Sequence, residues 1–156
     1  MKNLEQIRAR NAMEAAAKNI AGVNGGEVIK KIPPLIMNHG LLAIGAYAYD
    51  EKNTGFKGVM DAIANHLSDR EIALIPEQDS LQKKKYSELE QKIKNLEKGG
   101  PGTEDFRQLK SQWMKLSPMG YLLEYLVTNA DSTLLKRCTA ETMAWLEYAR
   151  RFIKKA

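Results

Sequence analysis

The chain has 156 residues and one cysteine, 28% of its residues are charged, and its formal net charge at pH 7 is +5. This length suffices for one domain that buries about 70% of its unfolded surface, so residues 1–156 are predicted to form a single domain. One cysteine excludes both a disulfide within the chain and a zinc site built on cysteines. The excess of cations permits a polyanionic partner such as nucleic acid without requiring one.

The first predicted helix begins after Asn3 and runs to about Asn19. Asn3 followed by Gln6 resembles a capping box, in which each side chain bonds to the backbone N–H of the other residue. A stripe of mostly small residues is expected to face inward and let a neighbouring helix approach closely: Ala9, Ala12, Met13, Ala16 and Ile20. The consecutive glycines Gly25 and Gly26 favour a turn after this helix.

Two prolines interrupt the next apolar pattern. Apolar residues at helical spacing continue from Val28 to Ile36, but Pro33 and Pro34 lie among them. Proline removes a backbone donor and clashes with the preceding turn. We therefore expect a kink or a new helix start at this point.

Two further helices are expected before residue 68. Apolar residues favour one helix at 41–49, and a polar turn at 50–55 ends it. A second, amphipathic helix is predicted at 55–67, where apolar residues recur at positions i, i+3, i+4, i+7 and i+11. Residues 68–76 fit either a loop or one apolar helical turn.

The composition changes at residues 77–98 to mainly lysine, glutamate and glutamine. Four apolar residues mark one side of this segment: Leu81, Leu89, Ile93 and Leu96. Such a pattern is typical of a solvated helix with a narrow apolar seam. A glycine-rich loop at 99–102 ends it, and this loop lacks the Lys and hydroxyl residue of a phosphate-binding P-loop. With a second amphipathic helix ending at Leu116, residues 77–116 are predicted to form a charged helical hairpin inserted into the bundle.

The strongest helical signal covers residues 131–155. The helix before this segment is expected to begin at Ser117–Pro118, where a capping serine stands before a proline. In the last helix the apolar residues fall in an arc of roughly 120°, the width of a core-facing stripe. They are Leu134, Leu135, Cys138, Thr142, Trp145, Leu146, Ala149, Phe152 and Ile153. This helix is expected to be the central strut of the bundle, with Cys138 as a buried structural thiol.

No segment shows the period-two alternation of a half-buried strand, so we predict an all-α fold. The expected architecture is a single compact bundle of five to seven helices with the charged hairpin as an extension. No apolar run reaches the ~20 residues that span a bilayer, and the N-terminus lacks the apolar core of a signal peptide. A cytoplasmic protein without membrane contact is expected.

The residues give little support for catalysis. His39 and His66 lie on separate segments, and neither has a second ligand at i+3 or i+4 that would form a helical metal site. His39 is expected to be a polar residue at a helix end, and His66 to interact with the dipole at a helix C-terminus. Acidic residues are scattered among lysines, so no carboxylate with a raised pKa is expected. The chain is therefore expected not to be an enzyme and to hold neither a cofactor nor a metal.

The basic residues have two interpretations. Lys30 and Lys31 directly precede the prolines, and Arg137, Arg150 and Arg151 lie on the outer side of the last helix. Such cations are ordinarily a solvated surface. They can also follow a phosphate backbone, because Lys and Arg along a nucleic acid release counterions without reading its sequence.

Three segments together resemble one known family. They are the run from Arg8 to Ala12, the run from Lys30 to Leu41, and the last helix from Leu135 to Phe152. This order is similar to the small helical subunit of the Cmr complex, the type III-B CRISPR RNA-guided effector. The most specific part is Lys-Lys-x-Pro-x-Leu-Ile followed by Asn-x-Gly-Leu in the second run. Residues 77–116 carry no such resemblance.

The resemblance implies a non-catalytic scaffold subunit in antiviral defence. Several copies of such a subunit stack beside the backbone subunits, along the guide RNA and its target strand, and cleavage belongs to other subunits. By this resemblance Lys30, Lys31, Arg137 and Arg151 are the candidates for contacts to phosphates or to a neighbouring subunit. A general helical protein–protein interaction adaptor without nucleic-acid contact is the alternative, with the hairpin at 80–116 as its working part.

Overall fold

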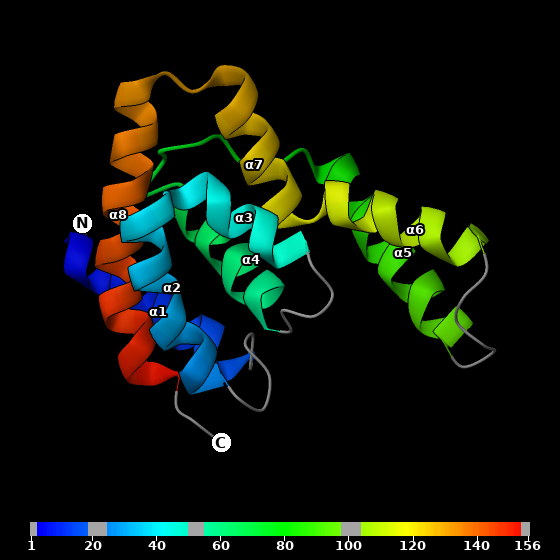
Figure 1. Ribbon diagram of the computed structural model, residues 1–156, viewed down its shortest axis with the longest axis horizontal. Helices are drawn as coiled ribbons and strands as arrows, with labels where there is room; N and C mark the ends of the chain where they lie inside the picture. The colour runs from blue at the N-terminus through cyan, green and yellow to red at the C-terminus, as the bar shows by residue number, and fades with distance from the viewer. Residues whose placement is uncertain (1–2, 19–24, 50–54, 98–103, 154–156) are drawn as a thin grey trace.

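The computed structural model describes residues 3–18, 25–49, 55–97 and 104–153. These residues form eight helices and no strand, so the all-α class is confirmed. The helices are α1 (Leu4–Ala17), α2 (Gly25–His39), α3 (Leu41–Tyr49), α4 (Phe56–Leu67), α5 (Ser80–Glu97), α6 (Glu104–Leu116), α7 (Pro118–Asn129) and α8 (Ser132–Phe152). Six helices form a bundle, and α5 and α6 form a hairpin that projects from one side of it (Figure 1). Both parts agree with the predicted architecture.

The expectation that α8 is the central strut is wrong, because α4 is the more deeply buried helix, with eight of its 12 residues buried. The helix α8 lies beside it with one face exposed and six of its 21 residues buried. It packs against α1, α2 and α4, and Trp145, Leu146 and Cys138 on its inner face are buried. Burial raises the pKa of the Cys138 thiol, which fits a structural role. Phe152 was expected inside but is 39% exposed. The helix ends at this residue, and the following Ile153 turns inward and takes the buried position instead.

The helix α1 begins with the predicted capping box. Asn3 and Gln6 each accept a bond from the backbone N–H of the other, at 2.9 Å. Its inner face is rotated from the expected one, because Met13 is 55% exposed. The buried residues of α1 are Ile7, Ala12 and Ala15. The expected inner residue Ile20 lies outside the described residues.

The helix α2 continues through Pro33 and Pro34. Of the two expected outcomes, a kink or a new helix start, the new start does not occur. The two missing N–H groups remove two bonds of the helical ladder. Burial of Ile29, Ile32 and Ile36 between α8 and the neighbouring helices offsets that loss. Gly25 and Gly26 begin this helix rather than forming the expected turn.

The segments around α4 follow the predicted pattern. The helix α3 covers 41–49 as expected, whereas the predicted polar turn falls largely on residues 50–54, outside the described ones. After α4, residues 68–76 form a loop rather than an apolar helical turn. The backbone N–H groups of Leu74 and Ile75 donate to the carbonyl of Leu67 at 3.1 and 3.3 Å. This anchors the loop and places Ile75 in the core.

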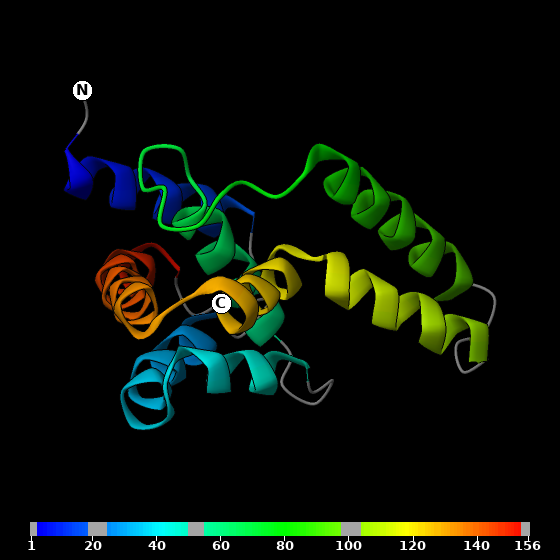
Figure 2. The same ribbon diagram turned by 90° about the horizontal axis from the view of Figure 1, so that it is seen from above.

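The hairpin packs mainly on itself. The main core of the bundle includes no described residue of α5, and α6 contributes only the half-buried Met114. Figure 2 shows α5 and α6 extending side by side away from the bundle. At the base, Gln78 Nε2 donates to the carbonyl of Leu116 at 2.8 Å, which ties the segment entering the hairpin to the one leaving it.

A close corner joins the hairpin to α7. The Ser117 hydroxyl donates to the carbonyl of Met114 at 2.6 Å and accepts from the N–H of Gly120 at 3.0 Å. A Cβ atom at Gly120 would lie 2.2 Å from the same Met114 carbonyl oxygen. Glycine is therefore required for α6 and α7 to meet at this distance.

Replacing residues 80–116 by a short Gly/Ser linker is expected to leave a protein that unfolds cooperatively, because the main core lies outside the hairpin. The measurement is urea unfolding followed by far-UV circular dichroism. The variant Ile63→Ala, which opens a cavity in the core, is the control for a truly central change and should lower the free energy of unfolding by about 2–5 kcal/mol. A broad, non-cooperative transition in the linker variant would show that the hairpin is needed to form the core.

Candidate interaction surfaces

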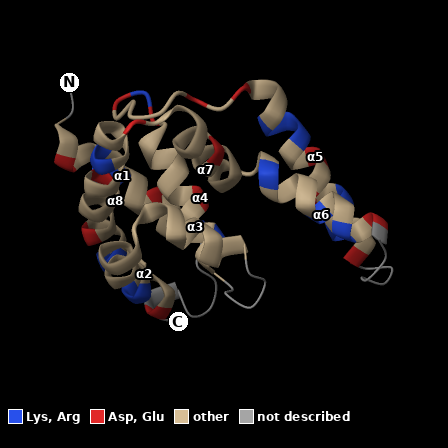
Figure 3. Ribbon diagram, turned by 45° about the horizontal axis from the view of Figure 1, so that its top comes forward, with Lys and Arg blue, Asp and Glu red and all other residues tan. Residues whose placement is uncertain are grey.

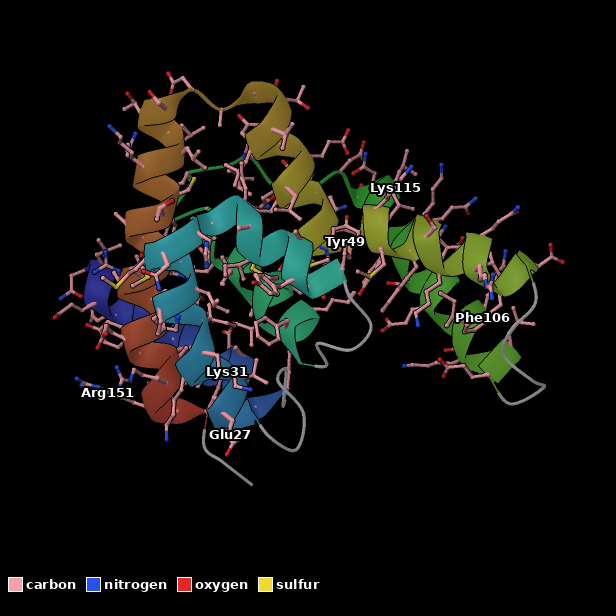
Figure 4. The ribbon with its side chains drawn as sticks, in the orientation of Figure 1. Glu27, Lys31, Tyr49, Phe106, Lys115 and Arg151 are labelled. Atoms are coloured by element: carbon pink, nitrogen blue, oxygen red, sulfur yellow. The ribbon has the colours of Figure 1, made fainter. Side chains whose placement is uncertain are left out.

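The structure brings together three of the four predicted contact residues. Lys30 and Lys31 are exposed on α2, and Arg151 is exposed near the end of α8. The two helices pack against each other, and Lys31 and Arg151 lie toward the same end of the bundle (Figure 4). We call Lys30, Lys31 and Arg151 the basic end. None of them forms an ion pair with another residue that the structure describes.

Arg137 is separate from the basic end. It lies 14 residues before Arg151 on α8, which corresponds to about 21 Å along the helix axis and a rotation of about 40°. Both side chains are exposed, so they share one side of α8 at different heights. A ligand that contacts both would have to extend along the helix.

The two arginines of the run from Arg8 to Ala12 pair with carboxylates of the fold. Arg8 donates two hydrogen bonds of 2.7 Å to the two carboxylate oxygens of Glu141 on α8. Arg10 pairs with Asp69 at 2.8 Å and with Glu71 at 2.9 Å. The hydrogen bond to Glu141 raises the pKa of Arg8, and the one to Glu71 raises that of Arg10. Both arginines hold α1 against its neighbours.

The carboxylate of Glu141 joins three helices. Besides Arg8 on α1 it lies 2.9 Å from Nε2 of His66 on α4. Burial alone would raise the pKa of Glu141, but hydrogen bonds from Arg8 and His66 outweigh this effect and lower it. Glu141 is 9% exposed, and its role was not foreseen from the sequence, because a glutamate in a core-facing stripe gives no periodic signal of its own.

His66 lies in the last turn of α4, as expected, but it is 1% exposed and bonds to side chains of two other helices. Its Nδ1 lies 2.8 Å from the amide nitrogen of Asn11, which can only donate. Nδ1 is therefore the acceptor, and Nε2 carries the proton that it donates to Glu141. This arrangement is the neutral imidazole, which agrees with a pKa lowered chiefly by burial. Trp145 stacks on the ring at 5.8 Å between centroids.

Stability should fall as the pH is lowered from 7 to 5.5, because of His66. Its folded-state pKa is lowered, so over this range the unfolded chain, with an ordinary histidine pKa of about 6.5, takes up the proton first. The free energy of unfolding is expected to fall by up to about 1 kcal/mol per pH unit. In His66→Gln this slope should flatten.

The measurement is urea unfolding at a series of pH values for the wild type and both histidine variants. His39→Gln is the matched control, since His39 is exposed at the end of α2. Equal slopes in the wild type and His66→Gln would show that His66 does not link protonation to folding.

A second cluster attaches the hairpin to the bundle. Nζ of Lys57 on α4 lies 2.6 Å from Oδ2 of Asp61 and 2.8 Å from the hydroxyl of Tyr86 on α5. It also lies 4.1 Å from the ring centroid of Trp113 on α6. Tyr86 and Trp113 stack nearly parallel at 5.8 Å. One cation of the bundle thus contacts both helices of the hairpin.

Asp61 overturns the expectation that no carboxylate has a raised pKa. Burial raises the pKa of Asp61, although Lys57 and the backbone N–H of Met119, at 2.9 Å, both act to lower it. The spacing of Lys57 and Asp61 at i and i+4 is visible in the sequence. Their aromatic partners lie on two distant helices, so sequence spacing could not identify this site.

Lys57→Met is expected to destabilise the protein by about 1–3 kcal/mol, because it leaves a largely buried carboxylate without its cation. The double variant Lys57→Met/Asp61→Asn should recover part of this loss, since asparagine is neutral and still accepts from Met119. Urea unfolding followed by tryptophan fluorescence gives the free energies. Equal losses in the single and double variants would mean that Lys57 acts through the aromatic rings alone.

A cleft of about 470 Å³ lies between α1, α4 and α5. Its charged lining consists of Glu14, Asp61, Asp69 and Glu90 against one cation, Lys18. A phosphate backbone would meet repulsion there. Among the described residues no group of three His, Cys, Asp or Glu side chains is placed to hold a metal ion.

The fold and its charge define a basic helical-bundle protein with a projecting hairpin. Over residues 4–155 the chain matches the family described as CRISPR-associated protein (Cas_Cmr5), and it therefore belongs to this Cmr5 family of CRISPR-associated proteins. The match confirms the resemblance seen in three segments and extends it across the hairpin. No curated protein and no solved structure matches the chain. No described helix combines the length and apolar character needed to cross a membrane.

Proposed function

We propose that this protein is a non-catalytic scaffold subunit of a type III-B Cmr effector complex in antiviral defence. The family match over residues 4–155 is the observation that carries the proposal. In this proposal several copies stack beside the backbone subunits in the cytoplasm, along the guide RNA and its target strand. The neighbouring Cmr subunits and further copies of the chain are its protein partners, and cleavage is performed by other subunits.

The basic end supports a contact to nucleic-acid phosphates. Lys30, Lys31 and Arg151 are exposed, whereas Arg8 and Arg10 are engaged with carboxylates inside the protein. Exposed cations can neutralise phosphates without loss of internal ion pairs. Arg137, on the same side of α8, would reach a strand that continues along that helix.

Single contacts of this kind are weak. A non-specific complex of one subunit with nucleic acid has a dissociation constant on the order of 10⁻⁴ to 10⁻⁶ M at physiological salt. Copies held side by side in one assembly bind at a high effective concentration, so their contacts reinforce one another. Weak individual binding is therefore compatible with a role along an RNA.

The alternative function is a general helical adaptor without nucleic-acid contact, which the projecting hairpin favours. Purification of the protein from its native cell separates the two functions. Co-purification with a set of short, discrete guide RNAs is expected for the Cmr subunit. Their reproducible absence under mild salt would favour the adaptor. Metal-dependent cleavage of RNA by the repurified protein would contradict a non-catalytic role.

Reversing charge at the basic end tests the nucleic-acid contact directly. Lys31→Glu/Arg151→Glu is expected to lower affinity about equally for unrelated RNA sequences and to flatten the dependence of affinity on salt, because fewer phosphates are neutralised. Thermal stability should change little, as for most surface substitutions. The measurement is fluorescence anisotropy with labelled RNA over a salt series.

The matched control is Lys84→Glu/Lys94→Glu, which changes two exposed lysines of the hairpin and gives the same net charge. This control shows whether a loss of RNA affinity depends on where the charges are reversed or only on the total charge of the protein. If Lys30, Lys31, Arg137 and Arg151 are all reversed and both affinity and salt dependence stay unchanged, these cations are not the nucleic-acid contact.

A further inference from the structure

Most of the net positive charge of the protein resides in the hairpin. Residues 80–116 include nine Lys and Arg and five Asp and Glu, a net charge of +4 out of +5 for the whole chain. Figure 3 shows Lys and Arg along both of its helices. None of the four cations predicted to contact nucleic acid lies in this segment. The hairpin is thus a second basic surface, distinct from the basic end.

A groove of about 460 Å³ lies between α5 and α6, and all of its lining residues belong to the hairpin. Leu89 and Leu116 form its apolar part. Three exposed lysines surround them, Lys85, Lys92 and Lys115, of which Lys115 is labelled in Figure 4. We call this site the hairpin groove.

Exposed leucines extend the apolar part of the groove along α5. Leu81 is 66% exposed and Leu96 is 40% exposed. At about 100° per residue, Leu81, Lys85, Leu89, Lys92 and Leu96 fall within an arc of about 80° on one face of the helix. Leu81 and Leu96 are about 22 Å apart along the axis, or four turns. On this face the two lysines lie between the leucines, so apolar and cationic side chains share one stripe.

The hairpin buries little of its own apolar surface. Among its described residues only Ile93 and Phe106 are buried. Two helices leave one side of their common seam open, and a third helix is the element that closes such a seam. An open stripe four turns long matches the length of about 15 residues of a helical ligand.

We propose that the hairpin groove binds an acidic amphipathic helix of a protein partner. The apolar residues of this helix pack on Leu81, Leu89 and Leu96, and its carboxylates lie beside Lys85, Lys92 and Lys115. This is recognition of a helix in a groove, with apolar anchors for affinity and flanking charges for orientation. It adds a docking site to the proposed scaffold and does not depend on RNA contact at the basic end.

The lining of the groove favours a protein over a nucleic acid. Single-stranded nucleic acids bind where bases stack on aromatic side chains along a positive track. No aromatic residue lines the groove, because Tyr86 and Trp113 stack on each other beside Lys57. A second copy of the hairpin is disfavoured as well, since both copies carry the net charge of +4.

The test uses the full-length protein and labelled synthetic peptides in fluorescence anisotropy. The acidic probe is a helix of about 16 residues with leucine at the a and d heptad positions and glutamate at the flanking positions. The basic probe has lysine in place of each glutamate, and uridine homopolymer RNA is the third probe. The leucine variant is Leu81→Ser/Leu96→Ser, and the charge variant is Lys85→Glu/Lys92→Glu/Lys115→Glu. Lys84→Glu/Lys94→Glu/Lys136→Glu, which reverses three exposed lysines outside the groove, is the matched control.

The wild type should bind the acidic probe, more weakly at high salt. Both the leucine and the charge variant should lose affinity by about 10- to 100-fold, and the control should keep it. The charge variant should gain binding of the basic probe, which a merely misfolded protein would not do. Contacts of this kind are expected to have a dissociation constant of ~1 μM. If the wild type does not bind the acidic probe at ~100 μM, the proposal is overturned. The proposal is also overturned if RNA binds and its binding requires the lysines but not the leucines, because the groove would then be a nucleic-acid surface.

Discussion

The carboxylate of Glu141 is the group on which the arrangement of the bundle depends. It lies in the core-facing stripe of α8 and accepts hydrogen bonds from Arg8 on α1 and from His66 on α4. A buried carboxylate is costly unless its hydrogen-bonding capacity is satisfied. The three helices must therefore meet in one relative orientation. Helices that pack through apolar stripes alone can slide and rotate against one another. The hydrogen bonds of Glu141 are all formed in one arrangement of the three helices.

Pairing with carboxylates of the fold also keeps Arg8 and Arg10 from ligands, Arg8 at Glu141 and Arg10 at Asp69 and Glu71. Their run is one of the three segments that resemble the family, and both guanidinium groups pair with carboxylates of the fold. The cations left exposed, such as Lys31 and Arg151, stand on other helices. The protein thus divides its cations into those that join helices and those that face solvent, and only the second group can meet phosphates without cost to the bundle.

The hairpin is fixed to this bundle at two points that differ in kind. At the corner with α7 the backbone of Gly120 lies against the Met114 carbonyl, which allows little variation in angle. On the other side, Lys57 contacts Tyr86 and Trp113 of the hairpin and pairs its ammonium group with the carboxylate of Asp61. Together these contacts hold the projecting pair of helices in place, while most of its surface and its open groove remain exposed. An arm anchored in this way suits docking of a partner.

The sequence by itself determined the all-α class, nearly every helix boundary and the core stripe of α8, because caps and apolar periods act within a few turns. The capping residues Asn3 and Ser117 both act as their local sequence indicates. Tertiary structure decided which face of α1 is buried and why α2 continues through Pro33 and Pro34. It also decided the positions of His66, Glu141 and Lys57. Each of these depends on partners more than 25 residues away, and the free energy gained from a distant partner has no signature in local sequence.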